Sequence, residues 1–181
     1  QFVFKVIPRE MYERLKDDLS SLRRNSSVTG TEEKRTFKID ISKYEFCEGK
    51  IETELDSFTI YVYSAEMIIV EKLRAICQQM PEYSLRPYSK PRARDFYDIY
   101  TIITKENIDL TITQNIELFK PIFEAKEVPL YLLWKIAETR DFHFSDWAAV
   151  EQAVVGEIED FDFYFNFVIE QVIKFEAFGI E

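Results

Sequence analysis

Two stretches with helical spacing of apolar residues, joined by a proline-punctuated segment, constrain the fold of this chain most strongly. After Ser64, apolar residues recur every three or four positions, which predicts a helix with one buried face up to about residue 80. A second such run begins at Asp95. Three prolines between Pro81 and Pro91 disfavour regular structure in the segment between the runs. The pattern predicts two packed helices joined by an irregular loop.

Basic side chains concentrate around this loop. Lys72 and Arg74 fall at the two margins of the first helix's apolar stripe, and four more bases follow: Arg86, Lys90, Arg92 and Arg94. Guanidinium groups beside Tyr83 and Tyr88 suit phosphates and unstacked bases, so the loop predicts binding of a polyphosphate or a nucleic acid. The alternatives are a solvated basic loop and a lysine that merely packs its stem along the helix.

Three aspartates complete the candidate site. Asp95 and Asp98 are three residues apart and therefore share one side of the second helix. Asp40 stands in the alternating run at residues 35–42, on the face opposite Phe37 and Ile39, where it could project into a cleft over a sheet. Two simpler interpretations stay open: a solvated edge strand for Asp40, and ordinary helix-dipole partners for the other two.

The rest of the chain predicts strands first and helices afterwards. Strands are expected at Phe2–Ile7, residues 51–55 and residues 58–63, and a helix is expected from Pro8 to Leu22. Further helices are expected before a break at Pro121, after Pro129 and after a Ser145 cap. The last helix is expected at Phe161–Phe178. This order predicts an α+β protein, with residues 1–105 as a mixed-sheet core and residues 106–181 as a helical bundle.

Composition excludes several classes of protein and site. No run of about 18 apolar residues occurs, so no membrane span is expected, and two cysteines without framework spacing favour a reducing, cytoplasmic setting. A single histidine excludes histidine-based triads and multi-histidine zinc sites, and there is no glycine-rich phosphate loop. The net charge of −10 argues against nonspecific coating of nucleic acid. Most of that charge lies at Glu138–Glu181, with eleven acids and two bases.

Two short motifs carry a family resemblance. The run EKLRA at residues 71–75, paired with RDFYDIY at residues 94–100, resembles the nucleotidyltransferase-like toxins of the AbiEii/AbiGii family, which belong to abortive-infection and type IV toxin–antitoxin systems. The run RTFKIDIS at residues 35–42 resembles the strand that carries the late carboxylate of that fold.

The resemblance implies a DNA-polymerase-β-like nucleotidyltransferase core that holds Mg²⁺ and an NTP, with RNA such as tRNA as acceptor and a cognate antitoxin as partner. It assigns Asp40 to metal binding. It assigns Lys72, Asp95 and Asp98 to catalysis, with Lys72 also meeting the phosphates beside Arg74. It assigns Arg92 and Arg94 to phosphate or RNA.

The chain departs from the family pattern at its start. The opening glycine-serine or glycine-threonine turn and the D-x-D pair of the family do not occur, and Gln1 leads directly into a strand-like run. We therefore expect an incomplete core that is inactive as it stands. A degenerate, non-catalytic relative that binds RNA or protein is the main alternative, and a purely structural helical adaptor is a third.

Overall fold

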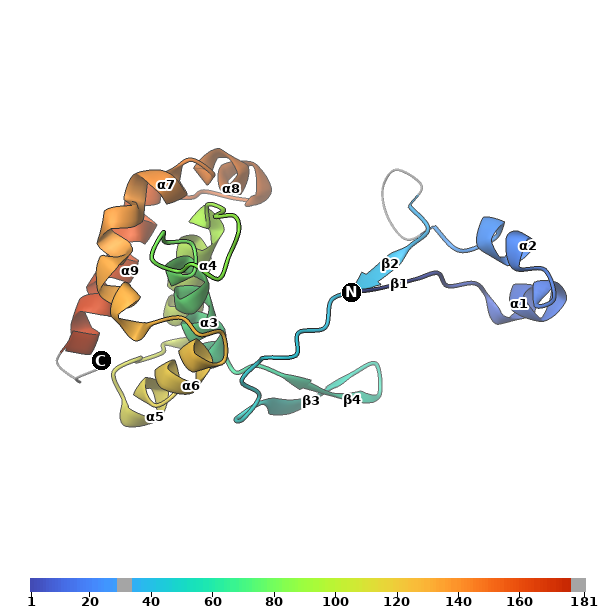
Figure 1. Ribbon diagram of the computed structural model, residues 1–181, viewed down its shortest axis with the longest axis horizontal. Helices are drawn as coiled ribbons and strands as arrows, with labels where there is room; N and C mark the ends of the chain where they lie inside the picture. Colours follow the sequence, from blue (N-terminus) through green and yellow to red (C-terminus); the bar gives the residue numbers. More distant parts are fainter. Residues whose placement is uncertain (29–33, 177–181) are drawn as a thin grey trace. The chain divides into compact units, whose positions relative to one another are not determined.

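The computed structural model describes residues 1–28 and 34–176 (Figure 1). The chain divides into two compact units, Gln1–Lys43 and Tyr44–Glu181. The boundary expected after residue 105 lies inside the second unit, where helices from both of its sides share one hydrophobic core.

Unit 1 contains a short two-stranded sheet and two helices. β1 (Phe2–Phe4) pairs antiparallel with β2 (Phe37–Ile39), so that Phe4 lies opposite Phe37 with ring centroids 5.5 Å apart. Both strands are shorter than the alternation predicted. Between them lie α1 (Arg9–Leu15) and α2 (Leu19–Arg24).

The single helix expected as far as Leu22 is wrong, because Asp18 starts a new helix. Its carboxylate accepts a hydrogen bond from the Ser21 amide at 3.0 Å, and its backbone is extended rather than helical. The first amides of a helix have no acceptor in the preceding turn, and a capping side chain supplies one for the Ser21 amide.

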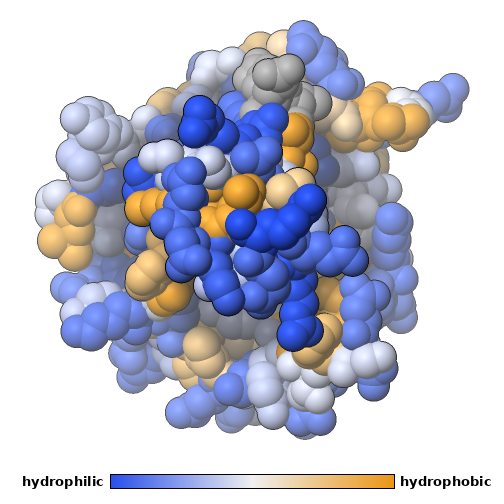
Figure 2. Space-filling model, turned by 90° about the vertical axis from the view of Figure 1, so that its right-hand side faces the viewer, coloured by the Kyte–Doolittle hydropathy of each residue, from blue (hydrophilic) through white to orange (hydrophobic). Residues whose placement is uncertain are grey.

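Unit 1 has no buried hydrophobic side chain among its described residues. Phe2, Phe4, Phe37 and Ile39 are all exposed, although the strand register places them on one face of the ribbon. On the face of the molecule drawn in Figure 2, hydrophobic residues likewise form patches between hydrophilic ones. A two-stranded ribbon without a core is marginally stable by itself.

Unit 2 opens with a β-hairpin. β3 (Ile51–Leu55) pairs antiparallel with β4 (Phe58–Val62). Both strands were predicted, the second one residue longer than observed. The two turn residues, Asp56 and Ser57, have positive φ angles of 50° and 67°. Positive φ at both positions is the type I′ arrangement, whose twist matches that of the two strands.

The two predicted helices follow the hairpin. α3 (Ala65–Cys77) begins after Ser64, whose hydroxyl accepts a hydrogen bond from the Met67 amide at 3.2 Å. α4 (Ala93–Glu106) ends at Asn107, which adopts the left-handed conformation that closes many helices. The expected apolar stripe is buried in full, although α3 ends at Cys77 and the last stripe residue lies beyond it: Ile69, Val70, Leu73, Ile76, Cys77 and Met80.

The remaining helices cover α3 and α4. They are α5 (Thr113–Ile116), α6 (Phe119–Glu124), the 3-10 helix η1 (Leu130–Thr139), α7 (Arg140–Phe144), α8 (Trp147–Ala153) and α9 (Phe161–Glu176). Pro121 lies in the first turn of α6, where proline is tolerated, so the expected break there is wrong. Asp146, not Ser145, immediately precedes α8. Residues 177 and 178, expected to end the last helix, lie outside the described residues.

Aromatic side chains fill the core between α4 and α9. Phe96 lies 5.5 Å from Phe161 and 5.3 Å from Phe165, measured between ring centroids, and Tyr100 meets Phe167 edge-to-face at 5.0 Å. Two small antiparallel sheets together with these helices confirm the α+β class. The mixed sheet of a partial nucleotidyltransferase core stays a prediction.

Candidate functional site

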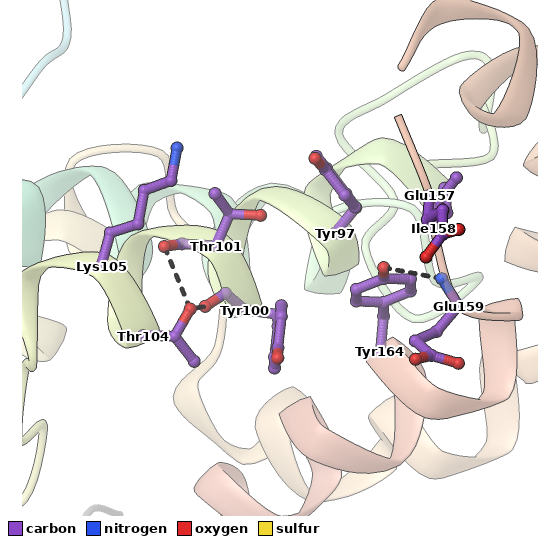
Figure 3. A pocket seen from close by; sticks show the side chains of 9 residues that line it. All are labelled: Tyr97, Tyr100, Thr101, Thr104, Lys105, Glu157, Ile158, Glu159 and Tyr164. Carbon is purple, nitrogen blue, oxygen red and sulfur yellow. Dashed lines mark hydrogen bonds between the residues drawn. The ribbon is translucent and has the colours of Figure 1, made fainter. Parts of the chain in front are cut away.

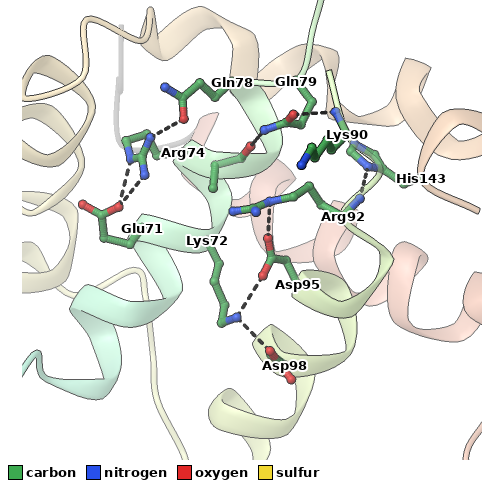
Figure 4. A network of polar contacts seen from close by, with 11 residues as sticks. Glu71, Lys72, Arg74, Gln78, Gln79, Lys90, Arg92, Asp95, Asp98 and His143 are labelled. Atoms are coloured by element: carbon green, nitrogen blue, oxygen red, sulfur yellow. Dashed lines mark hydrogen bonds and ion pairs between the residues drawn. The ribbon is translucent and has the colours of Figure 1, made fainter. Parts of the chain in front are cut away.

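Lys72 lies between the two aspartates of α4. Its Nζ donates to Asp95 Oδ1 at 2.9 Å and to Asp98 Oδ2 at 2.8 Å, and Figure 4 shows its side chain crossing from α3 to α4. Because Asp95 and Asp98 lie on successive turns of α4, one ammonium reaches both carboxylates. The sequence predicted that these residues would share a site, and the structure brings them together.

Two arginines hold the same carboxylates from the other side. Arg92 Nε lies 2.7 Å from Asp95 Oδ2, as an ion pair whose angle falls outside hydrogen-bond geometry, and Arg94 Nε donates to Asp98 Oδ1 at 2.9 Å. The cluster therefore contains three cations and two anions. Its excess of one positive charge favours an anionic ligand.

The charge of Lys72 is secured by its neighbours. Burial lowers the pKa of the ammonium, but the charges of Asp95 and Asp98 and their hydrogen bonds outweigh this and leave the pKa above its ordinary value. The side chain is partly buried, with 21% of its surface exposed. Lys72 is therefore a protonated donor at neutral pH rather than a general base.

An open cleft of about 220 Å³ adjoins this cluster. It is lined by Lys72, Arg74, Arg92 and Asp95, together with Tyr63, Ile68, Glu71 and Ala75. Burial, followed by the charges of Glu45 and Glu71, raises the pKa of Tyr63 to about 12, so its phenol stays a donor. Tyr63 was not predicted from the sequence, because nothing in its spacing links it to the cleft.

Arg74 forms a separate ion pair. Its guanidinium donates to Glu71 Oε2 at 2.7 Å and 2.9 Å and to Gln78 Oε1 at 2.8 Å. Figure 4 shows this group apart from the contacts of Lys72. Arg74 thus lines the cleft, as expected for a residue near the phosphates, but its charge is already balanced by Glu71.

Asp40 belongs to unit 1, whereas the other candidate residues belong to unit 2. The mid-strand position expected for it is wrong, because β2 ends at Ile39 and Asp40 follows it. Its Oδ1 accepts a hydrogen bond from Gln1 Nε2 at 2.9 Å, and the side chain is exposed.

Two buried polar side chains fix the backbone that carries the arginines. His143 Nδ1 accepts a hydrogen bond from the Arg92 amide at 3.0 Å, and Gln79 Oε1 accepts one from the Lys90 amide at 2.9 Å (Figure 4). Pro91, between them, has no amide hydrogen. Burial and the charge of Arg92 lower the pKa of His143 to about 4, so the imidazole is neutral. Sequence reasoning missed both residues.

One family model matches this chain, that of the nucleotidyl transferase AbiEii toxins of type IV toxin–antitoxin systems, over residues 4–167. The chain belongs to this family. The match includes every candidate residue from Asp40 to Asp98, and it confirms the resemblance that the motifs at residues 71–75 and 94–100 carry. No curated protein and no solved structure matched the chain.

The described part of this AbiEii-family protein does not by itself fit a Mg²⁺ site. Across residues 1–28 and 34–176, no three carboxylate, histidine or cysteine side chains gather closely enough to hold a metal ion. Asp95 and Asp98 each already face two cationic side chains, which would oppose a divalent cation. In the same described ranges, no helix is both long and apolar enough to cross a membrane.

Proposed function

We propose that this protein is a nucleotidyltransferase toxin that transfers a nucleotide from an NTP to an RNA, with tRNA as the acceptor. The observation that carries the proposal is the position of Lys72, fixed by two aspartates at the edge of a cleft with excess positive charge. Membership of the AbiEii family supports the same reaction class.

Lys72 is suited to hold a phosphate. An ammonium has three N–H donors, and Asp95 and Asp98 take two of them, which leaves one for a phosphate oxygen. The aspartates also orient the side chain, so less rotamer entropy is lost when the nucleotide binds. Asp95 and Asp98 thus act through Lys72 rather than on the nucleotide.

Arg92 and Arg94 are suited to the phosphates of the nucleotide or of the RNA. Their side chains are 36% and 51% exposed, and each contacts its carboxylate through Nε alone among the contacts observed. A guanidinium held at Nε keeps its terminal nitrogens for a second anion.

Nucleotidyl transfer joins an acceptor oxygen to the α-phosphorus of the NTP and releases pyrophosphate. Mg²⁺ as a cofactor is implied by the family resemblance alone. A cognate antitoxin follows from membership of a type IV toxin–antitoxin family.

Nucleotide transfer by the complete protein tests the proposal. Labelled NTPs and total RNA are incubated with wild type, Lys72→Ala and Asp95→Ala, and we expect both variants to lose about 10²-fold or more in rate, the usual effect of removing a charged group that stabilises phosphoryl charge. Lys120→Ala is the matched control, because Lys120 is an exposed lysine 3.9 Å from its single observed partner, Glu124. Full activity in both site variants would refute the assignment.

A non-catalytic, RNA-binding relative is the second candidate. It is favoured by the ion pairs that occupy Asp95 and Asp98, which leave no carboxylate of this cluster free for metal. Calorimetry of the complete protein with Mg²⁺ and each of the four NTPs separates the two. Micromolar NTP binding supports the transferase, and RNA binding without NTP binding supports the alternative.

A further inference from the structure

A second open pocket, of about 630 Å³, lies on another face of α4. Its α4 residues are Tyr97, Tyr100, Thr101, Thr104 and Lys105, at the spacing of one helix face, and residues 157–159 and Tyr164 close the other side (Figure 3). The pocket shares no lining residue with the cleft beside Lys72. It borders the candidate nucleotide site, because the Arg94 guanidinium lies 5.5 Å from the Tyr97 ring centroid.

Three tyrosines form the floor of this pocket. Tyr164 meets Tyr97 and Tyr100 edge-to-face, with ring centroids 5.2 Å and 5.3 Å apart, and its hydroxyl accepts a hydrogen bond from the Glu159 amide at 3.1 Å. Within the described ranges, the hydroxyls of Tyr97 and Tyr100 make no hydrogen bond. Ring faces and free phenols of this kind are suited to cationic ligands.

Two carboxylates stand at one end of the pocket. Glu157 and Glu159 are exposed, and neither side chain has an ion pair or hydrogen bond with any residue that the structure describes. Figure 3 shows them near Tyr164, with Lys105 at the opposite end. Gly156, at a φ of 114° that favours glycine, turns the chain just before them. The surrounding sequence from Glu138 onward carries a net charge of −9.

Arginine fits this combination better than lysine does. A planar guanidinium stacks on aromatic rings and bonds carboxylates through parallel donors, whereas an ammonium is a compact point charge. The molecule already uses such contacts, since the Arg94 guanidinium lies 5.5 Å from the Tyr97 ring centroid and that of Arg140 lies 4.9 Å from that of Phe144.

We propose that this tyrosine–glutamate pocket is a docking site for an arginine side chain presented by a partner protein. Charge complementarity identifies the side chain. Val155, fully exposed next to Gly156, gives the loop an apolar group that suits a protein surface rather than a small cation. This docking site uses none of the residues assigned to nucleotide transfer.

A titration of the full chain with a defined probe tests the proposal. The probe is N-acetyl-glycyl-arginyl-glycine amide, and its neutral isostere carries citrulline in place of arginine. Tyrosine ring resonances are followed by NMR. We expect saturable shifts with a millimolar dissociation constant for the arginine peptide and at least about tenfold weaker binding of the citrulline peptide.

Matched variants locate the binding. Glu157→Gln combined with Glu159→Gln should weaken arginine binding about tenfold, whereas Glu170→Gln, which neutralises an exposed acid of α9 outside the pocket, should leave it unchanged. Equal binding of both peptides, no binding, or insensitivity to the pocket variants would overturn the proposal. Tighter binding of free spermidine than of the arginine peptide would also overturn it, by assigning the pocket to small cations.

Discussion

At the scale of single residues, the orientation of Lys72 depends on a chain of contacts that runs through Asp95 and Arg92 to His143. Its ammonium is held by Asp95, which also pairs with Arg92. The backbone of Arg92 is in turn held by His143, from α7. A buried side chain 51 residues away in sequence therefore fixes the start of α4.

Protonation of His143 would break this contact. Nδ1 is the acceptor for the Arg92 amide, so the neutral ring carries its hydrogen on Nε2, and a proton on Nδ1 removes the acceptor. The ring is fully buried and packs 5.3 Å from Phe96, between ring centroids, so a charge on it would lack bulk solvation.

The lowered pKa of His143 predicts a specific pH dependence of stability. The unfolded chain takes up a proton near pH 6.5, whereas the folded protein does so only near pH 4. The free energy of unfolding should therefore fall as the pH falls from 6.5 to 4, by roughly 3 kcal/mol. Urea unfolding at several pH values measures this.

The variant His143→Asn is the control for this prediction. Asparagine does not titrate, but it offers an oxygen to the Arg92 amide. The fall in the free energy of unfolding between pH 6.5 and pH 4 should therefore be smaller in this variant than in wild type, by the roughly 3 kcal/mol assigned to His143. His143→Leu also removes the titration but leaves that amide without an acceptor, at a cost of about 1–3 kcal/mol relative to asparagine. An unchanged pH slope in His143→Asn would assign the effect to other groups.

At the scale of elements, the sequence predicted correctly those features of α3 that depend on interactions between residues close together in the chain. The apolar spacing of α3 and the Ser64 cap were read correctly because both depend on residues within one or two helical turns. The break at Asp18 was missed because a helical apolar spacing continues across it, while a side-chain hydrogen bond to Ser21 decides the local conformation.

Long-range contacts explain most of what the sequence did not predict. The Lys72 cluster was expected because its motifs lie on two adjacent helices, whereas Gln79 and His143 hold the loop through backbone amides, which have no sequence pattern. The pairing of Arg74 with Glu71 was likewise not predicted, because helical spacing brings residues three apart near each other but does not determine their side-chain conformations.

The Ser64 cap gives a prediction for α3. Ser64→Ala removes the acceptor of the Met67 amide and should lower the free energy of unfolding by about 0.5–2 kcal/mol. Ser64→Asp, which also caps helices, should retain most of the stability. Equal stability of Ser64→Ala and wild type in urea unfolding would mean that water replaces the cap.

At the scale of the whole molecule, burial is distributed very unequally between the two units. The hydrophobic core runs from Met67 to Phe175, entirely within unit 2, and no described hydrophobic residue of Gln1–Lys43 is buried. Since burial of apolar surface is the main stabilising contribution in folding, the two units should differ greatly in local stability.

Hydrogen exchange of the full chain measures this difference. Amides of α3, α4 and α9 should exchange only through global unfolding, whereas those of β1 and β2 should exchange through local opening, faster by several orders of magnitude. The β3–β4 hairpin, whose strand residues are exposed apart from the half-buried Ile60, provides an internal comparison and should exchange at an intermediate or fast rate. Slow exchange in β1 and β2 would contradict the prediction. It would show that the exposed ribbon face formed by Phe2, Phe4, Phe37 and Ile39 is covered in solution, because amides of so short a ladder are protected only when an apolar contact holds the strands together.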